Sequence, residues 1–171
     1  GGAFKPLPAQ RPAAKSIEAA VQRAGIEGGE VQDVVFGAAL QQGHQAGNIA
    51  RQALLRAGLP VSVAGMSIDR QCASGLMAIA TAAKQIVVDN MDITIGGGGE
   101  GIRLVQTPQM RIAADPELLA MHNDVYMPML QTAEVVAARY NISREVQDEY
   151  GLQSQQRTAA AQAAGKFDDE I

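Results

Sequence analysis

The segment MSIDRQCASGLMAIA, residues 66–80, holds the single cysteine of this 171-residue chain and joins two different patterns. Upstream, residues 61–68 form a short apolar run that predicts a buried strand. Downstream, apolar residues recur at helical spacing: Leu76, Ile79, Ala80, Ala83, Ile86 and Val87. The two patterns place Cys72 where a strand passes into a helix.

A thiol at this position differs chemically from a thiol in a protein core. The first turn of a helix presents unpaired N–H groups and the positive end of the peptide dipoles, and both stabilise a thiolate. Free cysteine is more often a small buried apolar side chain. From position alone, Cys72 is a candidate nucleophile, and a structural cysteine is the alternative.

The chain before residue 105 alternates helical and strand patterns. Residues 1–14 have three prolines and no period, which indicates a surface lead-in. Ser16 is expected to cap a helix over residues 17–24, and Asn48 a helix over residues 49–57. Strands are expected at residues 34–36 and 91–95, besides the strand before Cys72. This order predicts a three-layer α/β/α fold with a mixed, mostly parallel sheet.

After residue 105 the pattern changes. Residues 107–129 show no sustained period and are expected to form an excursion over the sheet. Helices are predicted over residues 133–140 and from Ser143 to about residue 164, the second being polar and solvated. We therefore expect a core domain over residues 1–106 and the start of a loop and helical region over residues 107–171. Both ends of the chain look truncated, so we treat it as a fragment.

Composition excludes several classes of protein. A net charge of −4 argues against general binding of nucleic acid or anionic membranes. One cysteine cannot form an internal disulfide. We find no run of about 18 apolar residues and no signal peptide. A cytoplasmic location without membrane association is the expectation.

A glycine run offers a second candidate site. Gly96, Gly98 and Gly101 satisfy G-x-G-x-x-G after a strand, which is the fingerprint of an NAD-binding oxidoreductase domain. A dinucleotide site also needs a helix that opens at the third glycine, and Pro108 stops the following segment within two turns. The alternative is a tight turn that lets backbones approach closely.

The two histidines are weaker candidates. His44 and His122 both lie in loop-like surroundings, and neither is at a metal-ligand spacing from the other or from Cys72. Either is a conceivable base for the thiol, but surface positions are the simpler interpretation. We predict no metal site.

Several segments together resemble the N-terminal half of the thiolase family. The nucleophile segment, residues 67–78, is similar to that family's cysteine signature. Further matches run in order along the chain: residues 1–4, 47–52, 96–100, 132–134, 142–145, 154–157 and 165–171. Two positions depart from the pattern. Asp69 stands where Asn or Thr is more usual, and Pro128 stands where short-chain thiolases tend to have a histidine.

The resemblance implies an acetyl-CoA acetyltransferase or 3-ketoacyl-CoA thiolase. Cys72 would form an acyl-enzyme in a ping-pong reaction, either condensing two acetyl-CoA molecules or cleaving a 3-ketoacyl-CoA. Coenzyme A thioesters would be substrates, with no covalently bound cofactor. The complete enzyme would be a homodimer or homotetramer.

The resemblance also implies that key groups lie elsewhere. In this family the activating histidine, the asparagine–water oxyanion site and a second cysteine belong to the C-terminal half. The family's opening strand has no counterpart before Gly1. We therefore expect the fragment alone to be inactive, and a non-catalytic thiolase-like domain remains a further alternative.

Overall fold

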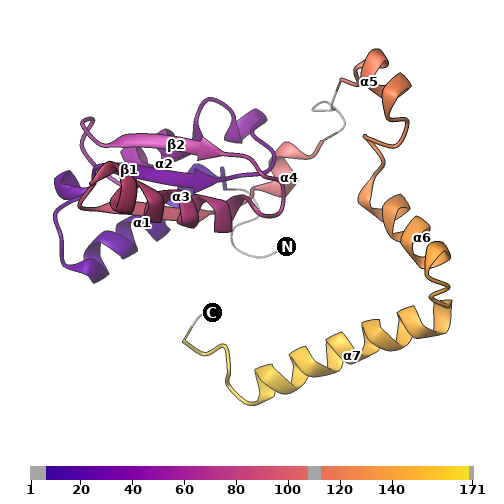
Figure 1. Cartoon of the computed structure of the whole chain (residues 1–171). Coiled ribbons are helices and arrows are strands. Elements are labelled where there is room, and N and C mark those ends of the chain that lie inside the picture. The colour runs from indigo at the N-terminus through magenta and orange to yellow at the C-terminus, as the bar shows by residue number, and fades with distance from the viewer. Residues whose placement is uncertain (1–6, 108–112, 170–171) are drawn as a thin grey trace. The chain divides into compact units, whose positions relative to one another are not determined.

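The structure is a computed structural model that describes residues 7–107 and 113–169 (Figure 1). It divides into two compact units, Gly1–Ile112 and Ala113–Ile171. Our predicted domain boundary between residues 106 and 107 stays a prediction. The sequence-matched residues 1–4, 170 and 171 lie outside the described residues.

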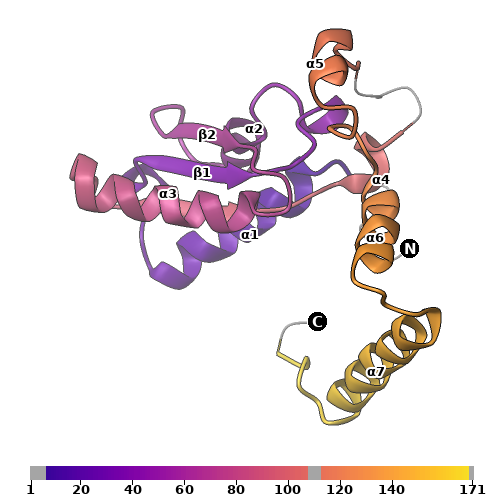
Figure 2. The ribbon, with the colours of Figure 1, turned by 45° about the vertical axis from the view of Figure 1, so that its right-hand side comes forward.

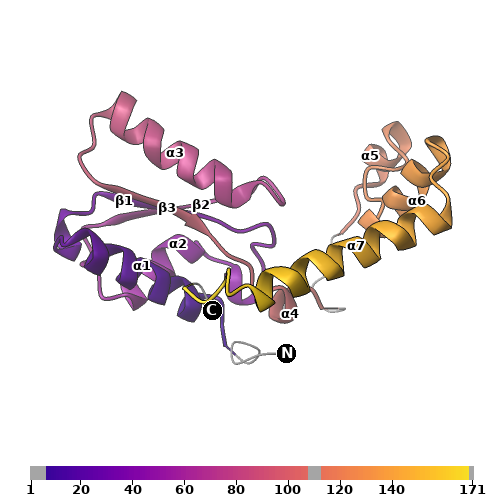
Figure 3. The same ribbon diagram turned by 90° about the horizontal axis from the view of Figure 1, so that it is seen from below.

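The first unit is a three-layer α/β/α arrangement. Its sheet has the order β2-β1-β3, formed by β1 (Asp33–Gly37), β2 (Ala64–Ile68) and β3 (Thr94–Gly98). Both pairings are parallel, with Asp33 opposite Ala64 on one side and Thr94 on the other. Helix α3 (Ser74–Asp89) covers one face of the sheet, and α1 (Gln10–Ala24) and α2 (Ile49–Arg56) cover the other (Figure 3). The predicted layers are confirmed.

The central strand β1 supplies side chains to both layers because successive residues point to opposite faces. Val34 and Phe36 join the larger core beneath α1 and α2. Val35 points the other way and packs with Ala78 and Ala82 of α3. All five residues of β1 are buried, as expected for the middle strand of a covered parallel sheet.

Helix α1 begins earlier than predicted. It starts at Gln10, and Pro12 is accommodated in its first turn, where the missing N–H has no intrahelical partner to lose. Ser16 is therefore inside the helix, with its hydroxyl 3.2 Å from the carbonyl oxygen of Pro12, and the prediction that it caps the helix was wrong. The predicted end is correct, since Gly25 adopts a left-handed conformation with φ of 68°.

Asn48 joins α2 to the strand that leads to Cys72. Its side chain caps α2 by accepting from the Arg51 N–H at 3.1 Å, as predicted. It also donates to the Gly65 carbonyl oxygen at 2.8 Å and accepts from the Ser67 hydroxyl at 2.9 Å. The start of α2 is thereby held against β2.

Strand β2 is shorter and more exposed than the predicted buried strand over residues 61–68. It begins at Ala64 and forms one edge of the sheet, so that Met66 is partly exposed, and Val61 before it is 79% exposed. Figure 2 shows β2 beside β1. Strand β3 also starts later than expected, at Thr94, and the glycine run forms its second half.

Short elements complete the first unit. Two 3-10 helices, η1 (Gly28–Glu30) and η2 (Gly43–Gln45), precede β1 and α2 respectively. A single helical turn, α4 (Ile102–Val105), follows β3.

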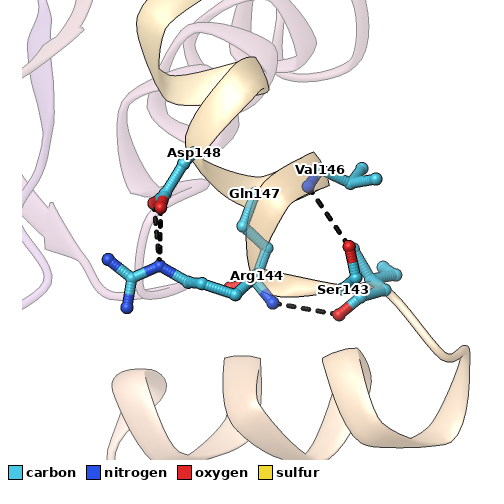
Figure 4. Close-up of polar contacts among 6 residues, drawn as sticks. Ser143, Arg144, Val146, Gln147 and Asp148 are labelled. Carbon is cyan, nitrogen blue, oxygen red and sulfur yellow. Dashed lines mark hydrogen bonds and ion pairs between the residues drawn. The ribbon is translucent and has the colours of Figure 1, made fainter.

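The second unit is helical: α5 (Pro116–Met121), α6 (Met129–Arg139) and α7 (Arg144–Ala163). Asn141 has a φ of 54° and separates α6 from α7, as predicted, although α6 begins earlier than expected. Ser143 caps α7 by accepting from the Val146 N–H, and Arg144 pairs with Asp148 one turn later (Figure 4). Helix α7 has no buried residue, which agrees with the predicted solvated helix.

Candidate functional site

Cys72 lies in the turn between β2 and α3, and its side chain is exposed. Helix α3 begins at Ser74 with Ala73 as its N-cap, so the thiol precedes the cap by one residue. The expected strand-to-helix position is confirmed, and an exposed side chain does not fit a structural core cysteine. Whether Cys72 is catalytic remains a prediction.

Side chains on either side of Cys72 fix the shape of this turn. Asp69 accepts from the Gln71 N–H at 2.8 Å, closing a local turn. Gln71 has a φ of 47°, a conformation that non-glycine residues seldom adopt. The buried Ser74 hydroxyl accepts from the Arg70 N–H at 2.8 Å and donates to the Gln71 carbonyl oxygen at 2.6 Å. These bonds hold the backbone that presents the thiol.

Glycines at the ends of two strands let the first turn of α3 lie directly on the sheet. A Cβ atom on Gly37 would lie 2.3 Å from the Ser74 carbonyl carbon and oxygen. A Cβ on Gly98 would lie 2.8 Å from the Cα of Gly75 and from the Gly37 carbonyl oxygen. Both positions exclude a side chain, because the obstructing atoms belong to the backbone.

The glycine run therefore serves helix packing. A Cβ on Gly96 would lie 2.7 Å from the Cα of Ile79, so this glycine also permits the close approach of α3. After Gly101 the chain forms only the four-residue α4. A dinucleotide site needs a full helix at that point, and the NAD-binding alternative is not favoured.

A polar network joins the end of β3 to the loop after β1. The Glu100 carboxylate accepts from the Ala39 N–H at 2.7 Å and from the amide of the fully buried Gln45. Gln45 in turn accepts from the Gly101 N–H. No sequence pattern pointed to Gln45, whereas Glu100 directly follows the glycine run and was recognisable only as part of a family motif.

The two histidines belong to different units of the chain. His44 is exposed in η2 in the first unit, and His122 ends α5 in the second. No hydrogen bond joins His44 to the thiol among residues 7–107. No group of three or more metal-ligating side chains occurs in the part of the chain that the structure describes.

The outer face of α3 carries large, exposed apolar side chains. Ala78, Ala82 and Gln85 face the sheet, whereas much of the predicted apolar stripe faces outward, with Leu76 and Val87 74% and 79% exposed. A helix that is apolar all round is usually buried on every side. Contrary to our sequence prediction, residues Gln71–Asp89 are long and apolar enough to cross a membrane. Core helices of soluble proteins share this length and composition.

Comparison with known proteins gives consistent matches over the whole chain. The family model described as thiolase, N-terminal domain, matches residues 1–171. An acetyl-CoA acetyltransferase of Chromobacterium violaceum is 39% identical over all of this chain and 46% of its own length. A 3-ketoacyl-CoA thiolase of Bacillus subtilis is 39% identical over 91% of this chain and 40% of its own.

A solved structure agrees with these sequence matches. The crystal structure of the Bacillus anthracis acetyl-CoA acetyltransferase has a TM-score of 0.80 and 34% identity, covering 100% of this chain and 46% of that one. The chain thus spans about half the length of the relatives that it matches. With its cysteine turn, glycine-packed helix and end-to-end family match, the chain belongs to the thiolase family, of which it represents the N-terminal domain.

Proposed function

We propose that Cys72 is the nucleophile of an acyl transfer between coenzyme A thioesters. The observation that carries this proposal is the exposed thiol in a turn whose backbone is fixed from both sides. Membership of the thiolase family supports the choice of acyl-CoA as the substrate, since relatives are named acetyl-CoA acetyltransferase and 3-ketoacyl-CoA thiolase.

The reaction would proceed in two steps. The Cys72 thiolate attacks the thioester carbonyl carbon, the bond from that carbon to the sulfur of coenzyme A breaks, and the departing thiolate takes up a proton. In the second step the α-carbon of another acyl-CoA, having lost a proton, attacks the acyl-enzyme carbonyl and releases the Cys72 thiolate. Thiolysis of a 3-ketoacyl-CoA is the reverse sequence.

The turn offers a way to stabilise the first tetrahedral intermediate. A backbone N–H directed at a developing oxyanion lowers the barrier of acyl transfer, and we propose the N–H of Cys72 for this role. The bonds made by Ser74 support the proposal, because they hold the adjoining backbone before substrate arrives.

We propose that turnover needs residues beyond these 171. The relatives are about twice as long, and the exposed apolar side chains of α3 support a larger folded assembly. The family resemblance assigns the activating histidine and the second cysteine to that further part. A homodimer or homotetramer is proposed for the complete enzyme.

Acylation can be tested on the chain because Cys72 is its only cysteine. The protein is incubated with excess acetyl-CoA, and the intact mass and peptide map are recorded. We expect one acetyl group, located on Cys72, and no adduct in the Cys72→Ala control. Acetoacetyl-CoA thiolysis, followed as loss of substrate, is expected to stay at the background rate.

Iodoacetamide labelling makes a negative result informative. If iodoacetamide labels Cys72 readily but acetyl-CoA leaves no adduct at any time point, the incubation is repeated on the chain extended to the full length of its relatives, where a missing adduct on an accessible Cys72 contradicts the proposed role. Thiolysis above background that disappears in Cys72→Ala would instead contradict the need for further residues.

A further inference from the structure

A pocket of about 530 Å³ lies in the first unit, and its lining comes from α1, α2 and the segments that precede them. It is formed where the start of α1, the η2 turn and α2 meet. Its walls contain three neutral residues, Pro8, Gln10 and Gln52, and three residues of basic type, Arg11, His44 and Arg56. Cys72 is not part of its lining.

Hydrogen bonds made by the Gln10 and Gln52 amides hold the walls of this pocket together. Gln52 uses its amide nitrogen to donate to the Ala46 and Gly47 carbonyl oxygens at 2.7 and 2.9 Å. Its oxygen therefore accepts from the Gln10 amide at 2.5 Å, and the same Gln10 nitrogen also donates to the His44 carbonyl oxygen. The pocket is thus preformed by bonds between three chain segments.

The pocket has an unbalanced positive charge. Arg11 and Arg56 come from different helices, and neither forms an ion pair within residues 7–107 and 113–169, where the pairs are Lys15–Glu18 and Arg144–Asp148. Among the residues that the structure describes, no Asp or Glu lines the pocket. In a chain of net charge −4, two unpaired guanidinium groups at one concavity favour an anionic ligand.

The backbone adds to this preference. The pocket includes the first turn of the 15-residue α1, which has no acidic residue and no side-chain cap at its N-terminus. The helix dipole at such an end attracts anions, whereas the backbone N–H groups of Arg11 and Ala13 already donate to the Pro8 and Ala9 carbonyl oxygens. Two arginines of different helices and a helix N-terminus therefore act in the same direction.

We propose that this pocket binds the phosphate group of a small molecule. Guanidinium groups bind phosphate through paired, charge-assisted hydrogen bonds, which a lysine or histidine cannot provide. The volume lies within the range of about 300–1,000 Å³ that is typical of small-molecule sites, so it admits a ligand larger than a bare ion. The phosphate belongs either to a nucleotide or to a free phosphate ion.

The test measures binding of inorganic phosphate and of adenosine 5′-monophosphate by isothermal titration calorimetry at low salt. Arg11→Gln and Arg56→Gln each remove one guanidinium and keep a polar side chain of moderate length. Arg23→Gln on α1 is the matched control, because Arg23 is exposed and lies outside the pocket. Circular dichroism checks that every variant is folded.

We expect each pocket variant to weaken binding about 10-fold or more, as for loss of a charge-assisted hydrogen bond. The control is expected to bind within about 2-fold of the unmodified chain, and binding is expected to weaken as salt rises. Tighter binding of the nucleotide indicates a nucleotide ligand, whereas equal affinities indicate that phosphate alone is recognised.

Two results would overturn the proposal: folded protein that binds neither probe at about 10 mM, or binding that is affected equally by the pocket variants and by Arg23→Gln. Cys72→Ala is expected to bind phosphate normally. The phosphate site and the proposed acyl transfer can therefore fail independently.

Discussion

Replacing Gly37 by alanine tests whether glycine is what allows α3 to seat on the sheet. The new Cβ would lie 2.3 Å from the carbonyl carbon and oxygen of Ser74 and 2.7 Å from the Gly75 nitrogen. Carbon atoms in good contact are about 3.5–4.0 Å apart, so β1 and the start of α3 must separate by about 1 Å. All three obstructing atoms belong to the backbone, and no side chain can rotate away.

The size of the effect follows from two opposing terms. Overpacking of this kind costs about 1–3 kcal/mol, and a backbone clash belongs at the upper end. Alanine also reduces the conformational entropy of the unfolded chain, which favours folding by about 0.4–1 kcal/mol. We therefore expect Gly37→Ala to lower the free energy of unfolding by about 2 kcal/mol, or more if strain spreads along α3.

Gly97→Ala is the matched control, because a Cβ at Gly97 in β3 would meet no atom within 4 Å. Urea unfolding followed by circular dichroism gives the two free energies, and the rate of iodoacetamide labelling reports on the turn at Cys72. The labelling rate is expected to change in Gly37→Ala only. The packing argument is refuted if the two variants unfold within about 0.5 kcal/mol of each other.

Three further changes test individual polar contacts. Asn48→Gly keeps the left-handed backbone (φ of 67°) but removes the side chain that joins α2 to β2. Urea unfolding should show that the free energy of unfolding falls by about 1–3 kcal/mol. A decrease smaller than about 0.3 kcal/mol would count against that role. Glu100→Ala removes the acceptor of the Ala39 N–H and of the Gln45 amide. We expect the free energy of unfolding to fall by about 1–3 kcal/mol and amide hydrogen exchange at Ala39 to become faster. Unchanged exchange at Ala39 would contradict the network. The hydrogen bond from Ser143 lowers the pKa of Glu145 below its ordinary value of 4.5. The ionised carboxylate therefore stabilises the folded state at pH values above the ordinary pKa. This stabilisation is lost as the pH falls through the lowered pKa. In Ser143→Ala the NMR titration midpoint of Glu145 should rise towards 4.5, and a midpoint that does not move would exclude this cause.

The sequence was sufficient for the order of elements in the first unit and for the position of Cys72. Alternating helix and strand patterns restrict a chain of this kind to a parallel, layered sheet. The ends of two helices were also recognisable from residue type. Gly25 ends α1 and Asn48 begins α2, and both have a positive φ. Local chemistry decides these features, so a single sequence reveals them.

Contacts between distant segments were not predictable in this way. The start of α1 was missed because Pro12 suggested a loop, although proline fits the first turn of a helix. Strand β2 was expected to be buried because its apolar run looks the same at the edge of a sheet as in the middle. Periodicity found the α3 helix but not its buried face, because the sheet covers its small residues and leaves Leu76 and Val87 exposed.

The glycine run shows most clearly what the sequence determined and what the tertiary structure determined. From the sequence alone, Gly96 and Gly98 fitted both a phosphate-binding loop and a tight approach of two backbones. Only the tertiary structure decided between them, by placing α3 so close to β3 that a Cβ at either position would meet backbone atoms at less than 3 Å. The sequence alone determined that a lone thiol follows a strand and precedes a helix. Only the tertiary structure showed that the thiol is exposed and that hydrogen bonds of the Asp69 and Ser74 side chains hold its turn.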